Sequence, residues 1–291
     1  MKQFEGKTAV ISGGAEGIGL AVAKALGEEK MNIVLADIDE ASLGAAAQEL
    51  HDMGIPVLAV ALDVAEEEQW QTVANETLKR FGKIHMLVNN AGVAGEAERI
   101  EEMNEKTWQW VMGVNLMGVV FGAKTMIPHI KAHQEGGWLL NVASIAGMGG
   151  VPLGGVYTAT KTAVVGLSES WAAELAADGI GVSVLCPAFV KTRIHQSGRN
   201  RHENYKLDQD SSRTKTGRLD KVKEAVENGI DASIVGSRVV EAIKQGELYI
   251  FTHPNYRPVI QHRSENIDAA FERAAKSPLL KDVANQKLTR F

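Results

Sequence analysis

Three residues near the middle of the chain have side chains suited to moving a proton to or from an alcohol. Tyr157 and Lys161 stand four residues apart in the segment YTATK, and Ser144 precedes the tyrosine by thirteen residues. On a helix, residues four apart lie on one face, one turn from each other. A lysine ammonium stabilises a nearby phenolate, and a tyrosine that acts as a base near neutrality needs its pKa lowered by roughly three units, about 4 kcal/mol. The three residues form a candidate acid–base set, although a Tyr and a Lys at this spacing also occur as a plain helix surface pair.

A glycine-rich turn near the start of the chain stands between a strand and a helix. The apolar residues 8–11 run into SGGAEGIG, which contains Gly13, Gly17 and Gly19, and a helical sequence follows. Such a turn lets the backbone approach a pyrophosphate, which then rests on the helix N-terminus. The spacing G-x-x-x-G-x-G differs from the G-x-G-x-x-G fingerprint. The evidence for a dinucleotide site is therefore the position of the glycines between a strand and a helix.

An acidic residue ends the next apolar segment, residues 32–36. Asp37 lies about 20 residues after the glycine-rich turn, a place from which a carboxylate accepts both hydroxyls of an adenosine ribose. A 2′-phosphate would meet the charge of Asp37 and of Glu16, and no Arg or Lys occurs in residues 36–40 to receive it. We therefore expect NAD(H) rather than NADP(H). The alternative is that Asp37 merely caps the helix that begins at residue 40.

Two further polar segments follow expected strands. The segment VNNAG, residues 88–92, comes after the apolar run 84–88, and Asp63 ends the strand expected over residues 57–62. Asn and Gly after a strand commonly form an ordinary turn. Together with Asp63, they outline the adenine side of a dinucleotide crevice.

The order and identity of these motifs resemble the single-domain type of short-chain dehydrogenase/reductase. The family commonly has Pro-Gly after the sixth strand, where this chain has Pro187 followed by Ala188, and we do not expect this change to abolish binding. The matching segments extend over residues 8–192 and are SGGAEGIG, Asp37, Asp63 with Val64, NNAG at 89–92, Asn115 in VMGVNLMG, Ser144 in NVASIAG, YTATK, and Pro187 with Thr192 in PAFVKT.

The resemblance implies an oxidoreductase that interconverts a secondary alcohol and a ketone by hydride transfer. Tyr157 would be the acid–base catalyst, Ser144 would hydrogen-bond the substrate oxygen, and Lys161 would lower the tyrosine pKa and hold the nicotinamide ribose. Asn115 would fix a water that connects Lys161 to solvent, or would serve only in capping or packing. The cofactor contacts implied in the same way are Gly13, Glu16, Gly17, Ile18, Gly19, Asp37, Asp63, Val64, Asn90, Ala91, Gly92, Tyr157, Lys161, Pro187, Val190 and Thr192.

Segments typical of strands and helices alternate along the chain. The alternation predicts an α/β fold with one doubly wound parallel sheet of seven strands, a Rossmann fold, with helices on both faces. Ligands bind at the carboxyl ends of the strands in such a fold. Strands are expected near residues 7–12, 31–36, 56–62, 83–88, 137–143, 180–186 and 247–251, and helices near 17–29, 40–53, 66–80, 104–133, 155–177, 231–244 and 257–275.

Two segments fall outside the motifs. Residues 191–228, within an expected catalytic domain 1–252, are polar and match the position of the family's substrate-binding lid. Their basic side chains slightly outnumber the acidic ones, which suggests an anionic substrate or, as we prefer, a solvated mobile flap. Residues 253–291 are expected to form a helical extension that packs on the domain or on a neighbouring subunit. The segments ELYIFTHP and YRP resemble Cα-dehydrogenases of aryl alcohols, which favours a bulky aromatic or alicyclic substrate.

Composition and charge fit a soluble cytoplasmic enzyme. The net charge of −5 over 291 residues, with no basic stripe, argues against nucleic acid as a partner. The single cysteine, Cys186, suits a reducing compartment, and we expect neither a signal peptide nor a membrane span. The histidines lack metal-ligand spacing, so no catalytic metal is expected. Because the family pairs the 104–133 and Tyr157 helices across a two-fold axis, the resemblance implies a homodimer or homotetramer, with a candidate patch of Ala159, Ala163, Val164 and Trp171.

Two other functions remain open at this point. The chain could be a non-catalytic NAD-binding sensor, because a fold by itself does not prove chemistry. It could also be an NADP-linked reductase of a biosynthetic ketone. The complete set of Asn115, Ser144, Tyr157 and Lys161 speaks against the sensor, and the acidic Asp37 and Glu16 speak against NADP.

Overall fold

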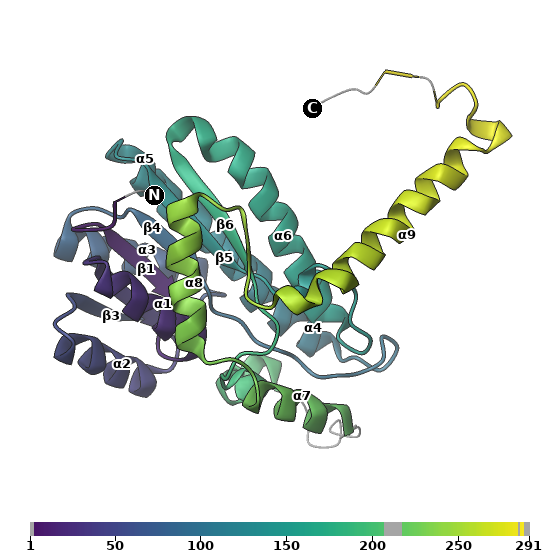
Figure 1. Cartoon of the computed structure of the whole chain (residues 1–291). Coiled ribbons are helices and arrows are strands. Elements are labelled where there is room, and N and C mark those ends of the chain that lie inside the picture. The colour runs from purple at the N-terminus through teal and green to yellow at the C-terminus, as the bar shows by residue number, and fades with distance from the viewer. Residues whose placement is uncertain (1–2, 207–216, 285, 288–291) are drawn as a thin grey trace. The chain divides into compact units, whose positions relative to one another are not determined.

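Short runs of apolar residues form seven strands that pair in one parallel sheet (Figure 1). The strand order is β3-β2-β1-β4-β5-β6-β7, so the order reverses direction between β1 and β4. In a doubly wound sheet, such a switch point is where ligands bind. The predicted seven-stranded Rossmann sheet is confirmed. The strands are β1 (Thr8–Ser12), β2 (Asn32–Asp37), β3 (Val57–Ala61), β4 (Met86–Asn89), β5 (Gly137–Val142), β6 (Ile180–Cys186) and β7 (Tyr249–Phe251).

The computed structural model describes residues 3–206, 217–284, 286 and 287. The chain divides into two compact units, Met1–Thr252 and His253–Phe291, and the sheet belongs to the first. The predicted lid, residues 191–228, is described on both sides of a gap. Four of its charged residues lie outside the described residues: Asp208, Asp210, Arg213 and Lys215.

Helices cover both faces of the sheet, because successive strand residues point to opposite sides. On one face, Ile11 belongs to a core cluster with Leu26 of α1 and Val239 of α8. On the other face, Val10 packs in a cluster with Trp70 of α3. The helices of this unit are α1 (Gly17–Glu28), α2 (Glu40–Asp52), α3 (Glu67–Phe81), α4 (Glu105–Met112), α5 (Gly118–Ala132), α6 (Gly155–Leu175), α7 (Gly217–Glu227) and α8 (Ala232–Gln245).

A π-helical turn divides the helix that was predicted over residues 104–133. Helix α4 ends at Met112, the π turn covers Gly113–Met117, and α5 begins at Gly118. Single π turns inside α-helices occur frequently at functional sites. Here the turn contains Asn115, whose side chain is fully buried.

The α4–α5 segment, Glu105–Ala132, is long and apolar enough to cross a membrane by length and composition alone. Its apolar residues include Val119, Met126 and Ile130, which are buried in the core beneath the sheet. Burial in the protein core therefore accounts for part of the apolar composition of this segment.

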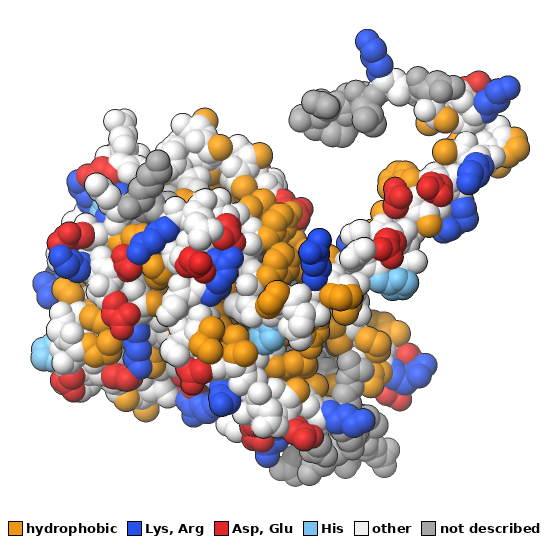
Figure 2. All heavy atoms as spheres, in the orientation of Figure 1, with side chains coloured by type: hydrophobic (Ala, Val, Ile, Leu, Met, Phe, Trp, Pro, Cys, Tyr) orange, Lys and Arg blue, Asp and Glu red, His pale blue; other side chains and the backbone are white. Residues whose placement is uncertain are grey.

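Charged side chains of both signs are interspersed on the face of the first unit that is turned toward the viewer in Figure 2. Oppositely charged side chains also pair between neighbouring elements: Lys24 of α1 pairs with Glu49 of α2 at 2.5 Å, and Lys244 of α8 with Glu29, which directly follows α1, at 2.7 Å. Such exposed pairs contribute little to stability individually.

Helices α1 and α8 lie side by side (Figure 1), and Gly236 of α8 lies against the backbone of α1. A Cβ atom at this position would lie 2.4 Å from the carbonyl oxygen of Ala21. We expect Gly236→Ala to lower the free energy of unfolding by about 1–3 kcal/mol, because the two backbones would have to separate. Urea unfolding would measure the loss. Gly44→Ala is the matched control, because a Cβ at Gly44 of α2 would meet nothing within 4 Å. Equal stability of the two variants would contradict the prediction.

The second unit, His253–Phe291, contains α9 (Arg257–Ala275) between two short 3-10 turns. None of the residues of α9 is buried, and Val259, Ile267 and Phe271 are among its exposed apolar side chains. That this extension packs on the domain or on a neighbouring subunit stays a prediction, and so does the dimer or tetramer. One residue of the proposed subunit patch was wrong, because Val164 is fully buried in the core.

Candidate active site

The residues predicted to bind a dinucleotide surround one cleft at the carboxyl ends of the strands. Of the predicted residues, only Gly19 and Asn115 do not line it. Gly19 instead lets the turn close, since a Cβ there would lie 2.1 Å from the carbonyl oxygen of Gly13. The predicted residues that line the cleft are Gly13, Glu16, Gly17, Ile18, Asp37, Asp63, Val64, Asn90, Ala91, Gly92, Ser144, Tyr157, Lys161, Pro187, Val190 and Thr192.

The glycine-rich turn leaves the N-terminus of α1 open to this cleft. Gly17 has a φ of +56°, which favours glycine, and the N-cap residue Glu16 makes no side-chain hydrogen bond to the first turn of α1. The side-chain amide of Asn90 donates to the carbonyls of Ser12, at 3.0 Å, and Gly13, at 2.8 Å, and so fixes the turn against the end of β4. Uncapped amide groups at a helix N-terminus suit the pyrophosphate of a dinucleotide.

Asp37 is held at the end of β2 with its carboxylate in the cleft. One carboxylate oxygen accepts from the amide of Ala15 and the other from the amide of Asp39, each at 3.0 Å. Burial raises the pKa of Asp37, and these two hydrogen bonds act in the opposite direction. The cap of α2 is Asp39, which accepts from the amide of Ser42 at 3.0 Å. Asp37 therefore does not cap that helix, and its carboxylate is placed to bind ribose hydroxyls.

The candidate acid–base set lies at the other end of the cleft. Tyr157 and Lys161 are one turn apart in α6, and the Lys161 ammonium is 5.7 Å from the centre of the tyrosine ring. The Tyr157 hydroxyl makes a hydrogen bond with Ser144, and Ser144 accepts from the amide of Ala146 at 3.1 Å. Lys161 also donates to the carbonyl of Val142 at 2.8 Å. The surface-pair alternative is wrong, because Lys161 is buried.

Burial dominates the titration of both groups. It raises the pKa of Tyr157, against a smaller opposite effect of the Ser144 hydrogen bond, and it lowers the pKa of Lys161 to about 8. The side chains around Tyr157 thus do not by themselves lower the phenol pKa as base catalysis requires. A positively charged nicotinamide in the cleft is a charge that would act in the required direction.

Asn115 positions the backbone at Val93, a residue that lines the cleft. Its side-chain oxygen accepts from the amide of Val93 at 2.8 Å, and its amide group donates to the carbonyl of Val93 at 2.9 Å. The side chain is thus committed to Val93, one residue beyond Gly92. The predicted role of Asn115 in holding a water near Lys161 stays a prediction.

The described part of the lid is more ordered and more fully paired than its polar sequence suggested. Short 3-10 turns cover Ile194–Asn200 and Glu203–Tyr205, and α7 follows the gap. Arg193 and Arg199 both form ion pairs with Glu16 of the glycine-rich turn. These arginines are therefore not available to bind an anionic substrate while the pairs persist. That the segment is a solvated mobile flap stays a prediction. Sequence reasoning missed α7, although Leu219, Val222 and Val226 follow a helical spacing.

A buried arginine attaches the predicted lid to Glu96 and to helix α4. Arg201 pairs with Glu96, donates to the hydroxyl of Thr107 at 2.8 Å, and lies over the ring of Trp110 with its guanidinium carbon 4.7 Å from the ring centre. Its side chain is only 7% exposed. No local sequence signal could have revealed this set, because Glu96 and Arg201 are far apart in the chain.

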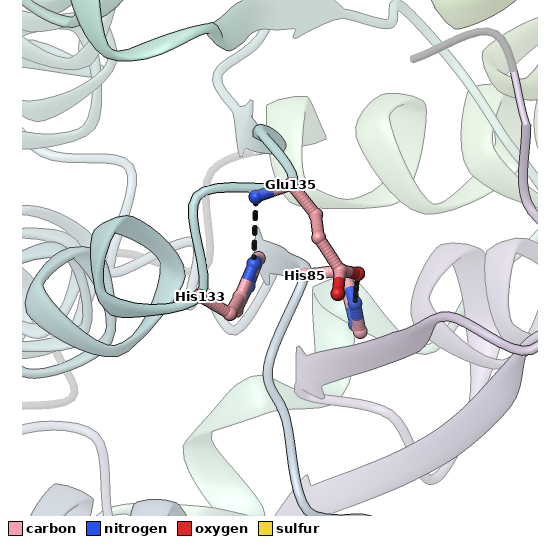
Figure 3. A group of neighbouring side chains, drawn as sticks. All are labelled: His85, His133 and Glu135. Atoms are coloured by element: carbon pink, nitrogen blue, oxygen red, sulfur yellow. Dashed lines mark hydrogen bonds and ion pairs between the residues drawn. The ribbon is translucent and has the colours of Figure 1, made fainter.

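A second cluster of titratable side chains lies at the amino ends of β4 and β5, away from the cleft (Figure 3). His85 accepts from the amide of Thr8 at 3.1 Å through Nδ1, so its Nε2 carries the proton and donates to Glu135 at 3.0 Å. His133 accepts from the amide of Glu135 at 3.2 Å and donates to the carbonyl of Ile84 at 2.7 Å. Because all four ring nitrogens have partners, we interpret the cluster as a structural link between strands rather than as a metal site.

The buried His85 is expected to make stability depend on pH. Burial lowers its pKa in the folded protein, whereas an unfolded histidine titrates near ~6.5. Below that pH, the histidine of the unfolded chain takes up a proton more readily than His85 of the folded protein does. The free energy of unfolding therefore decreases as the pH falls from that value toward the pKa of His85 in the folded protein. We expect the free energy of unfolding to fall between pH 7.5 and 5.5, and the fall to be smaller in His85→Gln. His51→Gln, at an exposed site, should retain the wild-type dependence. Identical slopes in wild type and His85→Gln would contradict this.

Comparisons with known proteins agree with the geometry. The short chain dehydrogenase family matches residues 7–203. A CLA biosynthesis dehydrogenase/reductase of Lactiplantibacillus plantarum is 34% identical over 92% of this chain and 95% of its own length. A C alpha-dehydrogenase of Sphingobium sp. is 29% identical over 92% of this chain and 87% of its own, as the resemblance of the C-terminal segments predicted. A short chain dehydrogenase/reductase of Burkholderia phymatum, solved in complex with NAD, is 35% identical over the full length of both chains with a TM-score of 0.89. On this evidence the chain belongs to the short-chain dehydrogenase/reductase family.

Proposed function

We propose that the protein is an NAD-dependent oxidoreductase that interconverts a secondary alcohol and a ketone. The observation that carries the proposal is that Ser144, Tyr157 and Lys161 share one cleft with the open N-terminus of α1 and the carboxylate of Asp37. A dinucleotide held by its ribose at Asp37 and its pyrophosphate at α1 would extend toward Tyr157. The strand order reverses between β1 and β4, and a doubly wound sheet binds its ligand at such a point, which supports the same placement of the dinucleotide.

The chemistry follows from the positions of the three polar side chains. The hydroxyl of Ser144 would donate a hydrogen bond to the substrate oxygen, and Tyr157 would take the proton of the alcohol in the oxidation direction. Lys161, one turn along α6, would stabilise the phenolate and bind the nicotinamide ribose. When bound, the oxidised nicotinamide accepts the hydride from the carbinol carbon.

The substrate end of the cleft favours a bulky, uncharged molecule. Trp110, Val114 and Tyr205 line it, and nearby Arg201 is neutralised by Glu96. The relatives include a C alpha-dehydrogenase and a dehydrogenase/reductase of CLA biosynthesis. These observations support an aromatic, alicyclic or similarly bulky secondary alcohol, and they disfavour the anionic substrate that the lid charges suggested.

The test is NAD+ reduction at 340 nm with a panel of aryl carbinols, sterols, alicyclic and short aliphatic secondary alcohols, run in parallel with NADP+. The proposal predicts turnover with NAD+ on a bulky class. Turnover with NADP+ alone would favour the biosynthetic reductase. NADH binding without turnover on any member of the panel would favour the non-catalytic sensor.

A further inference from the structure

Glu16 makes contacts that neither cofactor binding nor helix capping accounts for. Its carboxylate forms ion pairs with Arg193 and Arg199, two lid residues that are more than 170 positions away in the sequence. It leaves the first turn of α1 uncapped, although it occupies the N-cap position. The side chain of Glu16 is thus turned from its own helix toward the lid.

The same part of the lid lies against the glycine-rich turn. A Cβ atom on Gly17 would come within 3.1 Å of the methyl group of Thr192, the residue before Arg193. Glu16, Gly17, Thr192, Arg193 and Arg199 all line the cleft. A pyrophosphate at the N-terminus of α1 would therefore have the lid beside it, and the lid would have to move for the cofactor to leave.

Other described residues of the lid are attached elsewhere, which makes Glu16 the point at which the described part of the lid can open. Near the ends of the lid, the amide of Lys191 donates to the carbonyl of Ile230 at 2.9 Å and the amide of Ile230 to the carbonyl of Phe189 at 3.1 Å. Farther along, Arg201 is buried in its pair with Glu96. The pairs with Glu16 are more exposed: the side chains of Glu16, Arg199 and Arg193 are 31%, 28% and 47% exposed.

We propose that Glu16 is a positioning residue that holds the lid closed over the bound dinucleotide, and that breaking its ion pairs with Arg193 and Arg199 sets the rate at which the reduced cofactor leaves. The inference rests on the proposed function, because it requires that the cleft bind NAD(H). Exposed ion pairs are weak one at a time and are screened by salt. Two ion pairs with one carboxylate can hold the lid closed while the cofactor is bound. Because both pairs are exposed, they can also break together and let the lid open in each catalytic cycle.

The test is stopped-flow measurement of NADH release from the full-length protein, by loss of NADH fluorescence, at low and high salt. Glu16→Gln is expected to release NADH about tenfold faster than wild type, which corresponds to about 1.4 kcal/mol. Salt should accelerate release from wild type and affect the variant much less. Arg199→Gln should act in the same direction, and the double variant should be no faster than the faster single variant, because the two residues share one interaction.

Glu49→Gln is the matched control, because Glu49 pairs with Lys24 of α1 at comparable exposure and does not line the cleft. It should leave the release rate and its salt dependence unchanged. A Glu16→Gln variant with the wild-type rate and salt response would overturn the proposal. So would a variant whose only change is better use of NADP(H), since Glu16 would then act by repelling a 2′-phosphate. Wild-type protein that binds no NADH would overturn this inference together with the proposed function, whereas normal binding with unchanged release overturns this inference alone.

Discussion

Replacement of Tyr157 by Phe is expected to lower turnover by roughly 10²–10⁴-fold, the usual contribution of a general acid or base. The phenyl ring can keep its place in α6 beside Lys161, whose ammonium lies 5.7 Å from the ring centre. NADH binding should therefore persist, because the groups proposed to hold the adenosine and the pyrophosphate are unchanged. Steady-state turnover with the best alcohol of the panel, together with an NADH titration, measures both effects.

The control for this substitution is Tyr249→Phe. Tyr249 lies in β7 and does not line the cleft, and its hydroxyl donates to Glu169 of α6 at 2.7 Å. Tyr249→Phe should keep the wild-type turnover, which would show that removal of a tyrosine hydroxyl does not by itself lower turnover. If Tyr157→Phe retained more than about a tenth of the wild-type turnover, another group would have to transfer the proton.

Replacement of Asp37 by Ser is expected to shift the preference between the two dinucleotides toward NADP+ by about 10²-fold, or roughly 2.7 kcal/mol. The change removes a carboxylate that binds ribose hydroxyls and repels a 2′-phosphate. Arg193 donates to the hydroxyl of Ser42 at 3.4 Å. Hydrogen bonds from Ser42 lower the pKa of the Asp39 carboxyl, and the charges of Arg199 and Arg193 lower it further. Two guanidinium groups thus stand near this corner. The ratio of kcat/KM for NAD+ and NADP+ measures the shift.

Two further variants separate charge from shape at this site. Asp37→Asn removes the charge and keeps the size, so a large part of the shift should remain if repulsion is its cause. Asp52→Ser, at the far end of α2, should leave the ratio unchanged because Asp52 does not line the cleft. An unchanged ratio in both Asp37 variants would remove the physical basis for the NAD preference.

The structure also changes the basis of that preference. From the sequence, Glu16 and Asp37 were expected to repel a 2′-phosphate together. The charge of Glu16 is compensated by Arg193 and Arg199. The proposed discrimination would therefore depend mainly on Asp37, whose carboxylate is fixed by two backbone amides rather than by a cation.

The sheet and the cleft could be predicted because their signals are local in the sequence. Each buried strand is a short apolar run, and many of the residues that line the cleft end a strand or follow it directly, as Asp37 ends β2 and Asn90 follows β4. In a parallel sheet the carboxyl ends of neighbouring strands share one edge. Placing the strands correctly therefore brought these residues together.

The π turn and the lid contacts could not be predicted, because they depend on residues distant in the sequence. The π turn is accompanied by the pairing of Asn115 with Val93 across the fold, and a regular helix pattern surrounds it. The ion pairs of Arg199 with Glu16 and of Arg201 with Glu96 join the predicted lid to the glycine-rich turn and to the segment before α4. In the sequence these arginines are ordinary charges in a polar segment.

The most direct test of the central claim is a single-turnover reaction with the best secondary alcohol of the panel, deuterated at the carbinol carbon, and NAD+. The proposal predicts that the deuterium appears at C4 of the reduced nicotinamide, with a deuterium-containing NADH and an unlabelled ketone as products, and that Tyr157→Phe slows the transfer. Reduction without transfer of deuterium to the nicotinamide, or no reduction with any alcohol of the panel, would contradict it.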